Sequence, residues 1–528
     1  MPQKKPFNVP FSLIILSLAA ATALVALNLK FINYAYDDAY IHFRIAENFL
    51  KYGVPYYNVD EPVMGSSSPL WILVLAGLFS VFGVSIKAVA VLNGLIVSGA
   101  ATAWALILRE ETEKEVFCLV GFVSTLIVLY ISGAGLMETP LAVLLLGVGV
   151  ILFLRESPKL SVVFLTLAAF TRMELFIFLL TASAYYALKR KSLKWALPLA
   201  ITAAPFLLFN WHYFGSEIPQ PILAKPNVYG LSALESLATM IDSVLSPLFP
   251  LIPVKVGRVL FFVPLFASLS AFLIMNLGKT YSPRKKTATS FSYLITLPTT
   301  LLIVCYIFSK TIIFQWYIPL FYVPAITWAL SAAVHFNTIS IKALCIALLF
   351  PYIFSFSKDT ISFFGNPSMF SLFFPEARVR QLRKIARDLY AKYPNARVLA
   401  PEIGGVGFEF KGRIIDAIGL ITPEALRYRQ REISDPKETS NTKTDRTKLI
   451  GSVSREMILA FKPDIVLGLE TMLSSMEAPP LSDLYEKQIY PIFAQEDASI
   501  ATTKSIFMAR RINVYIRRDF VLKQKEIS

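Results

Sequence analysis

The sequence is poor in cysteine, histidine and charge. Its 528 residues include only three cysteines and three histidines. Cys118, Cys305 and Cys345 are far apart in the chain and each lies within an apolar run, so neither a disulfide framework nor a zinc site is expected. Charged residues make up 16% of the chain, against about a quarter in soluble proteins. This deficit argues against a soluble globular protein.

Long apolar runs take the place of the missing charge. Hydrophobic residues account for 55% of the chain, and many form runs of about 20 residues, the length that a helix needs to cross a bilayer. Because lipid offers no partners to backbone polar groups, such runs must be helices. The sequence therefore predicts a polytopic α-helical membrane protein.

The net charge of +15 could indicate a nucleic-acid partner. Many of the lysines and arginines, however, lie in short loops between apolar runs, as the positive-inside rule requires. The others are scattered through a polar tail without the interleaved aromatic residues of single-strand binders. We therefore expect membrane lipid as a partner and no nucleic acid.

The basic residues also set the expected orientation. Lys4 and Lys5 precede a first apolar run at about 9–29, which indicates a signal anchor with a cytoplasmic N-terminus. The alternative is a cleaved signal peptide, whose small-residue site would lie inside the run instead of after it. Leu70–Phe82 is too short to span comfortably and is expected at the outer interface. Later spans are expected at about 86–108, 116–133, 139–155, 193–210, 258–277, 290–308, 313–334 and 340–357.

The stretch at 160–188 carries Arg172 and Glu174 near its middle. At mid-bilayer each charge would cost about 2.5–3.5 kcal/mol. Two short helices would move both charges to an outer turn and leave Lys189–Lys191 in the cytoplasm. This division gives about 11 transmembrane helices of the length that a bilayer needs, in the plasma (inner) membrane, with the C-terminus outside.

The composition changes abruptly near Lys358. A helix near 377–393 and strands near 397–400, 412–416 and 463–467 predict a small α/β domain. We therefore expect a transmembrane module at 1–357 and an external α/β domain at 358–528.

The first outer loop begins with an acidic pair, Asp37-Asp38. If a helix starts there, Asp37, Arg44, Asn48 and Lys51 share one polar stripe. From spacing alone, a solvated interfacial helix with an aspartate N-cap explains the pattern equally well.

Seven short motifs follow one another along most of the chain. They are Asp37–Asn48, Gly65–Trp71, Leu136–Leu141, Thr171–Leu175, Tyr213–Lys225, Pro401–Gly404 and Ile415–Leu420. As an ordered set they resemble the GT-C class of lipid-linked-sugar glycosyltransferases, in particular the bacterial branch near the arabinofuranosyltransferase, lipopolysaccharide-modifying and protein O-mannosyltransferase families. The chain departs from their patterns where Gly135 is displaced by one position and where Met173 and Leu175 replace a proline and a glycine.

The resemblance implies a GT-C-like fold and an inverting enzyme. It would move a single sugar from a polyprenyl-phosphate donor to an acceptor glycan or cell-envelope polymer on the non-cytoplasmic face. A phosphate leaving group needs little acid catalysis, so one carboxylate base suffices, worth roughly 10²–10⁴-fold, unlike the two carboxylates of glycoside hydrolysis.

The resemblance also suggests roles for individual residues. Asp37 is the expected base, oriented by Asp38. Donor phosphate would be bound by Arg44, Arg172, Lys225 and His212, and substrate by Glu138, Glu174 and Tyr213. Glu138 and Asp37 are also a candidate pair for a divalent cation, but the relatives largely work without metal and no cofactor is expected.

Two other functions fit a polytopic chain. A transporter or lipid flippase would explain spans with buried charge, but transporters often carry internal repeats, and none is visible here. A non-catalytic scaffold would use the tail to bind a partner. The residues do not distinguish arabinofuranose, mannose, galactose or aminoarabinose donors, because all present the same phosphate and lipid.

Overall fold

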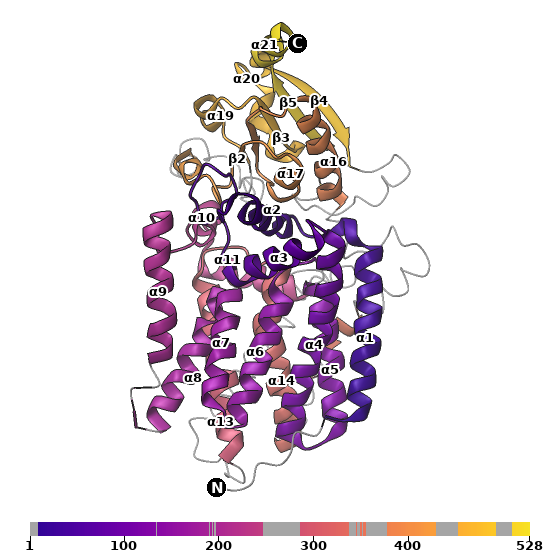
Figure 1. The fold of residues 1–528 in the computed structure, drawn as a ribbon, viewed down its shortest axis with the longest axis vertical. Coiled ribbons are helices and arrows are strands. Elements are labelled where there is room, and N and C mark those ends of the chain that lie inside the picture. The colour runs from indigo at the N-terminus through magenta and orange to yellow at the C-terminus, as the bar shows by residue number, and fades with distance from the viewer. Residues whose placement is uncertain are drawn as a thin grey trace.

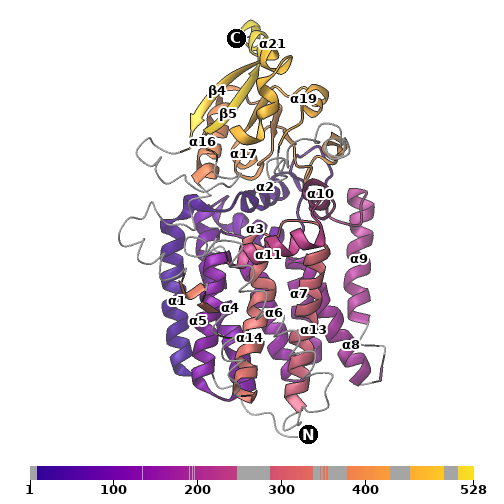
Figure 2. The ribbon, with the colours of Figure 1, turned by 180° about the vertical axis from the view of Figure 1, so that it is seen from behind.

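A computed structural model describes residues 9–245, 286–336, 345–354, 377–428, 452–492 and 509–527, except 134, 190, 193, 195–196, 346–348, 351 and 510. A bundle of helices forms one part of the molecule and a sheet domain lies against one of its ends (Figures 1 and 2). The predicted architecture, a polytopic helical membrane protein followed by a C-terminal α/β domain, is confirmed.

The bundle helices form where the sequence has its apolar runs. They are α1 (Phe11–Lys30), α4 (Ile86–Thr112), α5 (Glu115–Gly133), α6 (Thr139–Leu154), α7 (Pro158–Thr171), α8 (Phe176–Lys189), α9 (Leu197–Phe214), α13 (Lys286–Phe308) and α14 (Ile318–Phe336). By length and composition, four helices in the described part of the chain can cross a membrane, within Phe11–Lys30, Ile86–Thr112, Glu115–Ser132 and Gln315–Val334.

Several bundle helices are shorter than a full span. α6, α7 and α8 have 16, 14 and 14 residues. The expected span at 258–277 lies outside the described residues, as does most of 340–357. The count of about eleven spans therefore stays a prediction. The predicted break at Arg172 and Glu174 is confirmed, since α7 ends at Thr171 and α8 begins at Phe176.

Short helices cross the end of the bundle that faces the sheet domain (Figure 1). α2 (Asp37–Tyr52) starts at the acidic pair, as predicted, and ends at Gly53 with a left-handed φ of 71°, a usual helix stop. α3 (Pro69–Phe82) occupies the segment expected at the interface. α10 (Gln220–Tyr229) and α11 (Ala233–Leu245) meet at 103° at the same end.

The C-terminal domain is a five-stranded sheet with helices. Its sheet has the order β2-β1-β3-β5-β4, with β1 parallel to β2 and β3, and β5 antiparallel to β3 and β4. The predicted strands are confirmed as β1 (Val398–Ala400), β2 (Ile414–Asp416) and β3 (Ile465–Leu469), and β4 (Tyr485–Pro491) and β5 (Arg511–Arg517) are additional. The principal helices are α16 (Ala377–Lys392), α17 (Gly404–Glu409), α19 (Arg455–Phe461) and α21 (Arg518–Ile527).

The sheet domain and α2 share one hydrophobic core. Phe408 of α17 lies with its ring centroid 5.3 Å from that of Tyr40 and 6.0 Å from that of Phe43. Residues 39–48 of α2 are all buried, although spacing alone leaves a solvated interfacial helix open. The domain covers Arg44 and Asn48 of the polar stripe and leaves Lys51 exposed, so α2 is a shared element of both parts and holds the acidic pair between them.

Candidate active site

Two adjoining pockets lie between the bundle and the sheet domain. The domain-side pocket is lined by residues of both parts, and its empty space, which includes open solvent at its mouth, is about 780 Å³. The bundle-side pocket, about 390 Å³, reaches Glu138 and Arg172. Both are lined by Asp38, Ile41, Lys225, Trp316 and Leu420.

Asp37 binds the sheet domain through both carboxylate oxygens. The backbone N–H groups of Gly404 and Gly405 donate to it at 2.9 and 2.8 Å. A Cβ at Gly404 would lie 1.7 Å from the carbonyl oxygen of Asp37, so only glycine permits this approach. Burial, then the nearby charge of Glu402, raises the pKa of Asp37 to about 7, against the opposing effect of the two amides.

Asp38 and Lys225 stand together where the two pockets meet. Lys225 Nζ lies 3.9 Å from Asp38 Oδ2 and donates to Tyr317 Oη at 3.0 Å. The Asp38 side chain is 29% exposed and that of Lys225 15%. This juxtaposition offers a reachable carboxylate and a largely desolvated ammonium group to one ligand.

Glu138 and Arg172 line the bundle-side pocket, and Glu174 pairs with Arg172. Arg172 donates to Glu138 at 2.6 Å and lies 2.8 Å from Glu174, and its guanidinium covers the Tyr317 ring. His42 Nε2 lies 3.3 Å from the other Glu138 oxygen. Burial alone would raise the pKa of Glu138, but Arg172 and His42 outweigh it and lower the pKa to about 2.

Arg172 is therefore a cation with two carboxylate partners. Its paired charge makes it a weaker candidate for binding the donor phosphate than Lys225, which lies 3.9 Å from the Asp38 carboxylate. Glu174 also accepts a hydrogen bond from Tyr306 at 3.0 Å. A substrate role for Glu138 and Glu174 stays a prediction.

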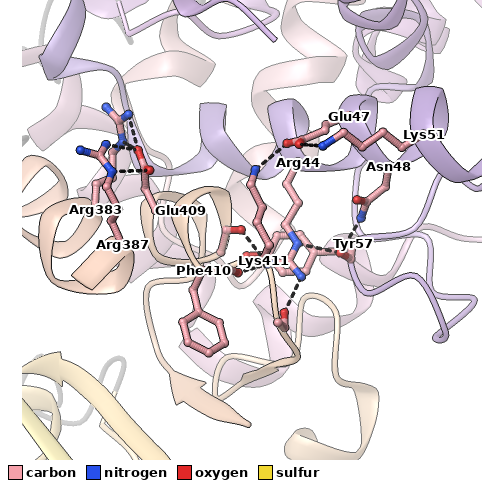
Figure 3. Close-up of polar contacts among 12 residues, drawn as sticks. Arg44, Glu47, Asn48, Lys51, Tyr57, Arg383, Arg387, Glu409, Phe410 and Lys411 are labelled. Atoms are coloured by element: carbon pink, nitrogen blue, oxygen red, sulfur yellow. Dashed lines mark hydrogen bonds and ion pairs between the residues drawn. The ribbon is translucent and has the colours of Figure 1, made fainter. Parts of the chain in front are cut away.

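The expectation that Arg44 binds phosphate is wrong, because its guanidinium is fully used within the protein. It donates to the carbonyl oxygens of Tyr57, Gly407, Phe410 and Gly412 at 2.6–2.8 Å and to Asn58 at 3.3 Å. Figure 3 shows the side chain reaching from α2 into the turn that follows α17. Arg44 lines neither pocket and joins the first loop to the sheet domain.

Further ion pairs flank Arg44 along the same seam (Figure 3). Lys411 and Lys51 both pair with Glu47, at 2.6 and 2.7 Å. Arg383 and Arg387 of α16 both bind Glu409 of α17, and Arg383 also reaches Tyr40 at 2.9 Å. We call the contacts that cross from the domain to α2, those of Arg44, the Lys411–Glu47 pair and the Arg383–Tyr40 bond, the docking seam.

His212 and Tyr213 lie outside the described pockets, so their predicted contacts with phosphate and substrate are not formed there. His212 is exposed near the end of α9. Tyr213 stacks on Phe209 with ring centroids 5.1 Å apart and packs against Tyr56. The Tyr213 motif contributes Lys225 to the site instead.

Sequence reasoning missed the aromatic wall and the part contributed by the sheet domain. Trp316 lines both pockets, and its backbone carbonyl accepts a hydrogen bond from the Thr139 hydroxyl at 2.9 Å. Glu402 and Arg378 line the domain-side pocket. Glu402 belongs to a motif that carried the family resemblance, which was the only available signal.

The residues around the pockets do not gather as metal ligands. In the ranges that the structure describes, no group of three or more His, Cys, Asp or Glu side chains could hold a metal ion. Glu138 is occupied by Arg172 and His42, so the cation pair that it was expected to form with Asp37 is not assembled. Independence from metal remains a prediction.

Comparison with known proteins yields structural likeness at low sequence identity. No protein-family model matches the sequence, and no curated protein matches it. The crystal structure of ArnT from Cupriavidus metallidurans bound to undecaprenyl phosphate aligns over 97% of this chain and 99% of that chain. The TM-score is 0.45 and the sequence identity 10%, values at which function has to be argued from the residues of this chain.

Proposed function

We propose that this protein is a membrane glycosyltransferase that uses a polyprenyl-phosphate sugar as donor. The observation that supports it best is the juxtaposition of Asp38 and Lys225, 3.9 Å apart, where the two pockets meet. A base and a phosphate-binding cation are the two groups that this transfer requires. The ordered motifs of the sequence point to the same reaction.

In the proposed reaction, the acceptor hydroxyl attacks C1 of the donor sugar from the face opposite the phosphate. The new C1–oxygen bond forms as the bond from C1 to the phosphate oxygen breaks, and the bonding electrons leave with the phosphate. Asp38 takes the hydroxyl proton, and Lys225 stabilises the departing anion in a site of low water access. One displacement inverts the anomeric centre.

Asp38 is a better candidate for the base than Asp37, which we favoured from the sequence. Both oxygens of Asp37 already accept backbone N–H groups, which fix its orientation toward the sheet domain. Asp38 is adjacent in sequence and lines both pockets. In this proposal Asp37 is a positioning residue that sets where Asp38 stands.

A transporter is the less suitable alternative. Transporters bind substrate near the bilayer midplane, at discontinuous helices. The two pockets instead lie at one end of the bundle, beside α2, α10 and the sheet domain (Figure 1). α1 begins at the opposite end, so a cytoplasmic N-terminus would put the pockets on the external face, where a glycan or envelope polymer is the acceptor.

The test uses purified full-length protein in lipid nanodiscs with a panel of decaprenyl-phosphoryl sugars and a cell-envelope glycan fraction. We expect transfer from one of the donors and a loss of at least 100-fold in Asp38→Asn, the size of a general-base contribution. Asp60→Asn, at an exposed position of the same loop, is the matched control. Wild-type transfer by folded Asp38→Asn would refute the assignment of the base.

A further inference from the structure

Glu402 carries a buried carboxylate oxygen with no hydrogen-bond partner in the described structure. It lies between β1 and α17 and its side chain is only 9% exposed. Arg378 Nε donates to Oε1 at 2.7 Å, while Oε2 has no partner among the described residues. Glu402 lines the domain-side pocket, so a ligand there can reach it.

An unsatisfied buried carboxylate oxygen is costly and calls for a donor. Asp38 cannot donate when ionised, and both oxygens of Asp37 already accept backbone N–H groups. Lys225 is engaged with Tyr317. We therefore expect a ligand to supply the missing hydrogen-bond donor. A hydroxyl group is suitable, because the Glu402 carboxylate already accepts a hydrogen bond from the Arg378 guanidinium.

Part of the lining of the domain-side pocket is aromatic. Phe314 and Trp316 are stacked with ring centroids 4.7 Å apart and an interplanar angle of 1°. Tyr36 lies 5.2 Å from Trp316, centroid to centroid. A pocket with an aromatic wall and a few fixed polar groups suits a small ring that has an apolar face and a polar edge.

We propose that the domain-side pocket is a sugar-ring subsite in which Glu402 Oε2 accepts hydrogen bonds from ring hydroxyls and Trp316 covers the apolar face of the ring. The sheet domain would thus supply recognition to a site whose Asp38 and Lys225 come from the bundle side. The assignment of the ring to a donor or to an acceptor rests on the proposed function. The proposal that the pocket binds a sugar ring does not depend on that function.

Direct binding tests this without any transfer. Full-length protein in nanodiscs is titrated with the methyl glycosides of mannose, galactose and arabinofuranose while tryptophan fluorescence is recorded. We expect one glycoside to give a saturable change that is absent in Trp316→Phe, and binding at least about tenfold weaker in Glu402→Gln, since bonds to charged groups are the stronger ones. Glu424→Gln, at an exposed position of the same domain, should bind as wild type.

A second variant covers the case in which Glu402→Gln does not fold. Ile418 is partly exposed and lines the same pocket, so Ile418→Trp should fill it and abolish binding without altering any charge. Unchanged affinity in folded Glu402→Gln, or the absence of a saturable response to all three glycosides in the wild-type protein, would overturn the proposal.

Competition identifies the source of the ring. If the subsite holds the sugar of the donor, a decaprenyl-phosphoryl sugar displaces the methyl glycoside whereas undecaprenyl phosphate does not. If it holds the acceptor, neither lipid displaces it. Glycoside binding without any transfer activity would reject the proposed function and leave the sugar subsite standing.

Discussion

Replacement of Arg44 by methionine should release the sheet domain from α2. Methionine keeps much of the apolar stem but removes five hydrogen bonds, four of them to backbone carbonyls. Bonds to charged groups contribute roughly 1.5–3 kcal/mol each, so a plain sum would reach about 7–15 kcal/mol. That sum is too large, because water can reach the freed carbonyls and burial of the guanidinium is itself costly. We therefore expect Arg44→Met to cost about 3–5 kcal/mol of local stability, the usual cost of breaking a buried ion pair.

Hydrogen exchange followed by mass spectrometry measures this locally. If α17 and β2 lose about 3–5 kcal/mol of local stability, their amides should exchange at least 100-fold faster, because each 1.4 kcal/mol is a factor of ten. Bundle helices far from the docking seam should keep their rates.

Lys51→Met is the control for loss of a cation from the same helix. Lys51 forms an i,i+4 pair with Glu47 and its side chain is 56% exposed, so its loss should cost less than about 0.5 kcal/mol. Exchange in α17 of Arg44→Met within threefold of the wild-type rate would refute the view that Arg44 fastens the domain.

Three further predictions concern the site. In the nanodisc assay, Lys225→Met should lower kcat/KM for the donor by about 10²-fold or more, because a desolvated cation is lost. Glu138→Gln should destabilise the protein by about 3–5 kcal/mol, because it leaves Arg172 and its charge under-compensated, visible as a lower Tm. Folding raises the pKa of Asp37 to about 7, so protonation of Asp37 stabilises the folded state. This stabilisation is complete below about pH 4, the pKa of an aspartate in the unfolded chain, and is lost as the pH rises through 7. Asp37→Asn should therefore make Tm less dependent on pH between these two values. For topology, a membrane-impermeant maleimide should label Asp60→Cys and not Lys159→Cys in intact cells.

The sequence predicted the helical bundle well because apolar runs are a local signal. The break at Arg172 could also be predicted, since charge at mid-bilayer is costly. Strand β4 could not be predicted, because most of its residues are exposed or only partly buried and it carries the charged Glu486 and Lys487. In sequence, such an edge strand resembles a loop.

The assignments to individual side chains depended on distant partners. Arg44 lies in a motif beside the acidic pair, and its spacing fits a ligand as well as a structural residue. The carbonyls that it binds are 363–368 residues further along the chain, and no local pattern reports them. The same distance hid Glu402, whose pocket exists only after the sheet domain is docked.

The contact between Asp37 and α17 has a consequence for how the protein matures. The two amides that hold the carboxylate belong to residues 367 and 368 positions later. During synthesis, the first loop therefore emerges long before the groups that orient it. Every helix up to α14 can be inserted while the acidic pair still lacks its partners, and the newly made bundle remains incompetent until the last third of the chain has arrived. If the chain has the proposed activity, this order of assembly would prevent transfer before the sheet domain is in place.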